Sequence, residues 1–67
     1  MMDIETKEAV LKLAGYEVEE GGNSRRTITV WRVYNKETAD NLGYGMNRTA
    51  AIKIAFNTFL TRQNDVF

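Results

Sequence analysis

Hydrophobic and polar residues follow a helical period near the start of the chain. Over residues 4–14 they separate into two halves of a helical wheel, and Asp3 precedes them as the expected N-cap. The apolar half contains Ile4, Val10, Leu11, Leu13 and Ala14, and the other half contains Glu5, Glu8, Ala9 and Lys12. Gly15 follows, and glycine readily adopts the left-handed conformation found at helix ends. The pattern predicts a first helix over 4–14.

A second helical pattern occupies the last third of the chain. It follows a glycine turn, Gly43-Tyr44-Gly45, and Asn47, which is expected to cap the helix. The apolar positions recur at the spacing of one helix face and are Ile52, Ala55, Phe56, Phe59 and Leu60. Ile54 points away from this stripe, onto an uncharged face with Ala50, Asn57 and Thr61. A helix over about 48–62 is predicted.

The middle of the chain has the two-residue period of strands. Residues 16–20 alternate apolar and acidic side chains, 21–24 form a turn, and 26–34 are rich in β-branched and aromatic residues. In this second strand Ile28 and Val30 share one face, and Trp31 and Val33 share the other. Either the strand is apolar on both faces or a bulge near Trp31 shifts its phase. We expect Ile28 and Val30 to face the core. Residues 38–44 fit a third strand or a loop.

These elements predict an α+β fold in a single domain of residues 1–67, with 1–3 and 63–67 frayed. The order is α-β-β-(β)-α, with two helices packed on one face of a small antiparallel sheet. The other face of the sheet is then open to solvent or to a partner.

Composition narrows the possible chemistry. The chain has no cysteine and no histidine, which excludes disulfides and catalysis through Cys-His or Ser-His pairs and leaves only carboxylates for zinc. We therefore expect no catalytic residue, cofactor or metal. Glu17 and Glu19 share a strand face and could form a carboxylate pair, although alternation alone explains them. No apolar run approaches a membrane span, and the N-terminus does not resemble a secretory signal, so the cytoplasm is the expected compartment.

The charges sum to zero, which argues against bulk attraction to nucleic acid. Residues 1–20 carry six acids against Lys7 and Lys12, whereas 21–36 carry four basic residues and no acid. This asymmetry indicates either a surface of two signs or two halves that neutralise each other across the fold.

The glycine turn and the helix after it resemble the end of the double-stranded-RNA-binding domain family. In that family the last strand closes with Gly-x-Gly and a Ser-Lys-Lys start opens an alanine-rich helix. Gly43 and Gly45 match the glycines, Asn47 stands in place of the serine, and Arg48 stands in place of the first lysine. Ala51, Ala55 and Leu60 fall on packing positions, and the resemblance extends loosely over 16–60. It implies phosphate contacts by Asn47 and Arg48, with Lys53 nearby and with Arg25 and Arg26 at the turn between the first two strands.

The chain also departs from that family. Thr49 and Ile52 stand where the family keeps lysines, and the first helix carries Glu5 and Glu8 where the family contacts RNA. Losing these phosphate contacts weakens binding and flattens its salt dependence. The element order is also similar to that of small domains encoded by bacteriophages.

Two hypotheses for function follow. The first is a non-catalytic module that binds a protein through Trp31, Tyr34 and Ile54, for example a phage or mobile-element modulator of a host protein that acts in the host cytoplasm. The second is a degenerate duplex-RNA-binding domain that contacts phosphates at the start of the last helix. Simpler alternatives exist: Trp31 could pack on the sheet, Arg25 and Arg26 could be a solvated hairpin end, and the glycines could serve only the turn.

Overall fold

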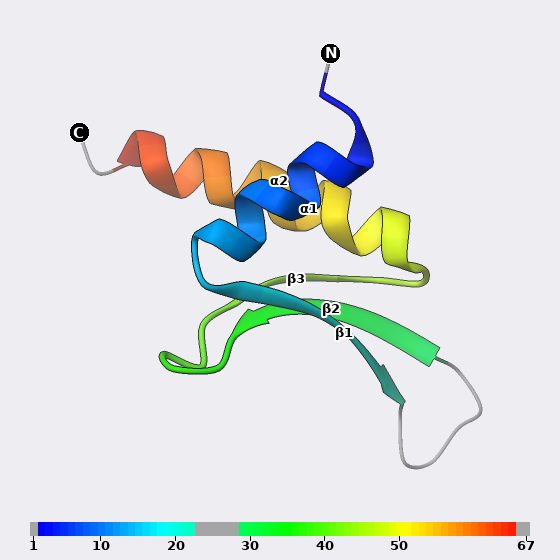
Figure 1. Cartoon of the computed structure of the whole chain (residues 1–67). Helices are drawn as coiled ribbons and strands as arrows, with labels where there is room; N and C mark the ends of the chain where they lie inside the picture. The colour runs from blue at the N-terminus through cyan, green and yellow to red at the C-terminus, as the bar shows by residue number, and fades with distance from the viewer. Residues whose placement is uncertain (1, 23–28, 66–67) are drawn as a thin grey trace.

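The computed structural model describes residues 2–22 and 29–65, which form an α+β domain. The elements follow one another as α1 (Ile4–Leu13), β1 (Tyr16–Gly22), β2 (Thr29–Asn35), β3 (Asn41–Gly45) and α2 (Arg48–Asp65). The strands form an antiparallel sheet in the order β1-β2-β3. Both helices cover one face of this sheet and leave the opposite face uncovered (Figure 1). The predicted fold class is confirmed, and residues 41–44 of the ambiguous segment form a strand together with Gly45.

Local signals account for the helix boundaries. The Asp3 side chain accepts a hydrogen bond from the Thr6 amide at 2.8 Å, and Gly15 has a φ of 97°, as expected for the start and end of α1. The Asn47 side chain likewise accepts from the Ala50 amide at 2.8 Å, which confirms it as the cap of α2. This helix extends to Asp65, three residues beyond the predicted end.

The core lies between the helices and the sheet. Its buried members are Leu11, Val33, Leu42, Ala51, Ile52, Ala55 and Phe56. The predicted apolar halves of the helices are only partly correct, because Leu13 is 90% exposed and Leu60 is also exposed. Leu13 is the last residue of α1, and the core contacts of that helix come from Ile4, Val10 and Leu11.

The expected orientation of the second strand is wrong. Val33 is fully buried and Trp31 packs against the core, so Val30 faces the open side of the sheet. Ile28 lies outside the described residues. The register between β1 and β2 is unbroken, and the irregularity lies instead between Val33 and Tyr34 in the pairing with β3. Trp31 and Val33 therefore face the helices without a bulge at Trp31.

A polar cluster joins the start of β1, the β2–β3 connection and the last turns of α2. The Tyr16 hydroxyl donates to Asp40 at 2.7 Å, and Arg62 forms an ion pair with the same carboxylate. The hydrogen bond from Tyr16, followed by the Arg62 contact, holds the pKa of Asp40 below its ordinary value. The Tyr16 ring also meets Phe59 edge-on, with 6.3 Å between the ring centres. These contacts anchor the C-terminal half of α2 to the sheet.

Candidate functional site

The uncovered face of the sheet carries the side chains that alternate with the core residues. It presents Glu17, Glu19, Val30, Arg32, Tyr34 and Tyr44. Pairing places Glu19, Arg32 and Tyr44 in one row across the three strands. Two aromatic side chains and an arginine therefore share a face that no described helix covers. We call these three residues, Arg32, Tyr34 and Tyr44, the sheet-face patch.

Arg32 is held in place on this face. Its terminal nitrogen lies 3.3 Å from a carboxylate oxygen of Glu19, and its guanidinium carbon lies 4.7 Å from the centre of the Tyr34 ring. The Tyr34 hydroxyl donates to the other oxygen of Glu19. Both partners fix the guanidinium, and side chains that are ordered in advance lose less conformational entropy when a partner binds.

The same contacts shift two ionisation equilibria. The hydrogen bond from Tyr34, with a further contribution from Arg32, lowers the pKa of Glu19. The hydrogen bond to Glu19 raises the pKa of Tyr34. A general acid needs a raised carboxyl pKa, and Glu19 is shifted in the opposite direction.

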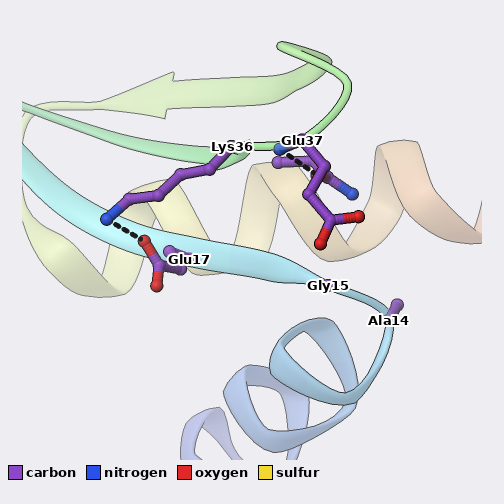
Figure 2. A pocket seen from close by; sticks show the side chains of 6 residues that line it. Ala14, Gly15, Glu17, Lys36 and Glu37 are labelled. Atoms are coloured by element: carbon purple, nitrogen blue, oxygen red, sulfur yellow. Dashed lines mark hydrogen bonds and ion pairs between the residues drawn. The ribbon is translucent and has the colours of Figure 1, made fainter.

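A shallow hollow of about 340 Å³ lies at the end of this face, lined by Ala14, Gly15, Glu17, Asn35, Lys36 and Glu37. Figure 2 shows the Lys36 ammonium directed at the Glu17 carboxylate, and the nitrogen lies 3.0 Å from the nearer oxygen. The Glu37 side chain lies apart from this ion pair. The ion pair with Glu17 raises the pKa of Lys36. Glu17 and Glu19 share a face, as expected, but each contacts its own cation and they do not form a carboxylate pair.

Two of the residues predicted to contact RNA phosphates lie together at the start of α2. Asn47 uses its side-chain oxygen to cap the helix, and Arg48 forms an ion pair with Glu8 of α1. Lys12 lies 3.2 Å from the same Glu8 carboxylate. Hydrogen bonding from Arg48, with a smaller contribution from Lys12, lowers the pKa of Glu8 although burial opposes this. Arg48 is therefore engaged within the fold.

The other predicted site residues are dispersed. Lys53 is exposed on α2, while Arg25 and Arg26 lie outside the described residues. Trp31 does not lie on the open face, because it packs against the core on the helix side, opposite Tyr34. Ile54 is 46% exposed and lies beside Gly43 at the margin of the sheet. The structure thus separates Trp31, Tyr34 and Ile54 instead of joining them.

Sequence reasoning missed Tyr44, which is 58% exposed on the open face. The sequence shows Tyr44 as the single large side chain between Gly43 and Gly45, but it lies in the segment that fitted either a strand or a loop. Only the pairing of Tyr44 with Arg32 places its side chain on the open face.

Neither described helix is long and apolar enough to cross a membrane. Within residues 2–22 and 29–65, no group of three or more acidic, histidine or cysteine side chains could hold a metal ion. Comparison with known protein families, with curated proteins and with solved structures finds no match for this chain.

Proposed function

We propose that this chain is a non-catalytic module that binds another protein through the sheet-face patch of Arg32, Tyr34 and Tyr44. The observation that carries this function is the uncovered sheet face, on which Arg32 is fixed between Glu19 and Tyr34. Tyrosine and arginine, together with tryptophan, are the residue types enriched at the energetic centres of protein interfaces. They combine a large contact area with hydrogen-bonding groups.

The charge distribution supports a protein partner better than a polyanion. Five ion pairs are present among the described residues, and they engage Lys12, Arg32, Lys36, Arg48 and Arg62. Binding to nucleic-acid phosphates depends on basic side chains that are free to replace counterions. Most basic side chains of the described residues already contact a carboxylate, so phosphate contacts by these side chains would require the pairs to be broken.

The alternative, a degenerate duplex-RNA-binding domain, has weaker support. Gly43 and Gly45 in the last strand, followed by an Asn47-capped helix, fit the resemblance seen in the sequence. Arg48, the residue most expected to contact phosphate, is instead paired with Glu8. A role as a phage or mobile-element modulator of a host protein agrees with the first function, and genomic context would test it.

Photo-crosslinking in the cells that make this protein tests the proposed function. A photoreactive phenylalanine at Val30 would lie on the open face, and the same residue at Leu13 serves as a matched control, since Leu13 is exposed on α1. We expect one protein to be linked from position 30 and not from position 13. Arg32→Ala should weaken binding of the recovered protein by about tenfold or more. Equal capture from both positions, or no adduct from position 30, would contradict the function.

A further inference from the structure

The Arg32 side chain crosses from β2 onto β1 on the open face of the sheet. A β-carbon on Gly21 of β1 would lie 3.7 Å from the Arg32 Nε atom and 3.8 Å from its Cζ atom, which are ordinary contact distances. The Nε atom is itself buried and has no hydrogen-bond partner among the described residues. A partner can therefore reach the guanidinium only at its terminal end.

Glu19 contacts two members of the sheet-face patch at once. One of its carboxylate oxygens lies 3.3 Å from a terminal nitrogen of Arg32, and the other accepts a hydrogen bond from the Tyr34 hydroxyl. The Arg32 Cζ atom also lies 4.7 Å from the centre of the Tyr34 ring, so each of the three side chains contacts the other two. Glu19 is thus held by Tyr34 as well as by Arg32.

This arrangement is compatible with two opposite roles for Glu19. Its carboxylate could occupy the place of an acidic group of the partner, which would weaken binding, or it could hold Arg32 in the orientation that the partner meets, which would strengthen binding. A partner carboxylate at Arg32 would lie close to Glu19, and like charges repel. The hydrogen bond from Tyr34, with a further contribution from Arg32, keeps the pKa of Glu19 below its ordinary value, so this repulsion persists at neutral pH. The contacts therefore favour the second role.

We infer that Glu19 is a positioning residue of the sheet-face patch and that it affects the partner through Arg32. The inference rests on the proposed function, because it assigns Glu19 a role in the same binding surface. An arginine side chain has many rotamers, and immobilising it when a complex forms costs affinity. Glu19 reduces this cost by holding Arg32 against Tyr34 before the partner arrives.

The NMR signals of the Arg32 side-chain protons test this positioning in the free protein. Protons held over the face of an aromatic ring shift upfield, so Tyr34 should give these signals an upfield shift that Tyr34→Leu removes. We expect Glu19→Ala to lose most of this shift, and Glu19→Gln, which keeps an acceptor oxygen, to retain part of it. Glu17→Ala is the matched control, because Glu17 lies on the same face but pairs with Lys36, and it should keep the full shift. Unchanged Arg32 signals in Glu19→Ala would overturn the inference.

Affinity for the protein recovered by photo-crosslinking tests the consequence for binding. Glu19→Ala should weaken binding by about three- to tenfold, the cost of ordering one arginine side chain. If Glu19 acts through Arg32, Glu19→Ala should cause no further loss in a chain that already carries Arg32→Ala. Stronger binding by Glu19→Ala would mean that Glu19 blocks the surface, and a further loss in the double variant would mean that Glu19 contacts the partner itself. Either result overturns the inference.

The two experiments separate a failure of this inference from a failure of the proposed function. If Arg32→Ala weakens binding and Glu19→Ala does not, the sheet-face patch stands and only the role of Glu19 is wrong. If no protein is crosslinked from position 30, the proposed function fails, and the role of Glu19 in binding fails with it even where the Arg32 signals depend on Glu19.

Discussion

Gly45 of β3 lies directly against the backbone of Ala51 in the first turn of α2. A β-carbon on Gly45 would overlap the Ala51 amide nitrogen and would lie 2.8 Å from the carbonyl carbon of Ala50. Both are backbone atoms of the helix, so neither can move aside alone. The absence of a side chain at position 45 lets α2 approach closely enough to bury Ala51 and Ile52.

Gly45→Ala should therefore destabilise the domain strongly. We expect the free energy of unfolding to fall by about 3 kcal/mol, the upper range for overpacking, because the helix must shift away from the sheet. Urea denaturation followed by circular dichroism measures this loss. Gly21→Ala is the matched control, since its β-carbon would meet no atom nearer than 3.7 Å and the loss should stay below about 1 kcal/mol. Equal losses would contradict the proposed close approach.

Gly43 and Ile54 should show coupled effects. A β-carbon at position 43 would lie 2.7 Å from the Cγ2 atom of Ile54, which is a side-chain atom and can be removed. Gly43→Ala alone should destabilise the protein, and Ile54→Ala in the same chain should restore part of the loss. We expect a coupling energy of about 1 kcal/mol or more from the double-mutant cycle. Strict additivity would indicate that the two residues do not meet.

The helices could be predicted because their signals are local. Asn47 lies within three residues of the amide that it caps, and Gly15 directly follows the end of α1. The orientation of β2 was not predictable in this way. Two pairs of apolar residues, Ile28 with Val30 and Trp31 with Val33, each have the two-residue spacing of a buried strand face, so the pattern fits either orientation. The choice depends on register: Val33 pairs with Val18 of β1, which packs against the core.

The candidate site was only partly predictable for the same reason. Tyr34 and Trp31 were both predicted to bind a partner, but only Tyr34 lies on the open face, because the orientation expected for the second strand was wrong. Glu8 falls on the polar half of the α1 wheel, yet its side chain is only 12% exposed because it reaches Arg48 of α2. That contact depends on how the two helices lie against each other, and no residue pattern within either helix specifies it.

The Glu8 contact predicts a loss of stability in acid. The pKa of Glu8 is below its ordinary value of 4.5, chiefly because Arg48 donates to it. A lowered folded-state pKa means that the stabilisation is present above the unfolded-state pKa and is lost as pH falls through the folded-state pKa. We expect the free energy of unfolding in urea to fall as pH decreases below about 4.5. Glu8→Gln should reduce this pH dependence and lower stability at pH 7 by about 1 to 2 kcal/mol.

Other carboxylates also titrate in this range, so the comparison needs a control. Glu37→Gln changes an exposed glutamate of the β2–β3 connection for which no ion pair is seen within the described chain. It should retain the acid dependence of the wild type. If Glu8→Gln and Glu37→Gln behave alike, the pair with Arg48 makes no specific contribution.

Ala39 adopts a backbone conformation that favours glycine. Its φ is 61°, whereas an alanine in the left-handed region is strained by its β-carbon. Ala39→Gly should relieve this strain and raise the free energy of unfolding by about 0.5 to 1 kcal/mol, which corresponds to a rise of a few degrees in Tm. Ala14→Gly is a useful contrast, because the φ of Ala14 is −81° and no strain is relieved there. A stability gain at position 14 and none at position 39 would contradict this explanation.

The state of Arg48 also predicts how the chain responds to duplex RNA. Because Arg48 is already paired with Glu8, we expect the amide resonances of residues 43–53 to remain unchanged when duplex RNA is added at a salt concentration of about 50 mM. Glu8→Gln frees Arg48 and is the variant in which weak binding should first emerge. Arg48→Glu should then abolish it. Shifts of the Asn47, Arg48 and Lys53 amides in the wild type, declining steeply with salt, would instead favour the RNA-binding function over the protein-binding one.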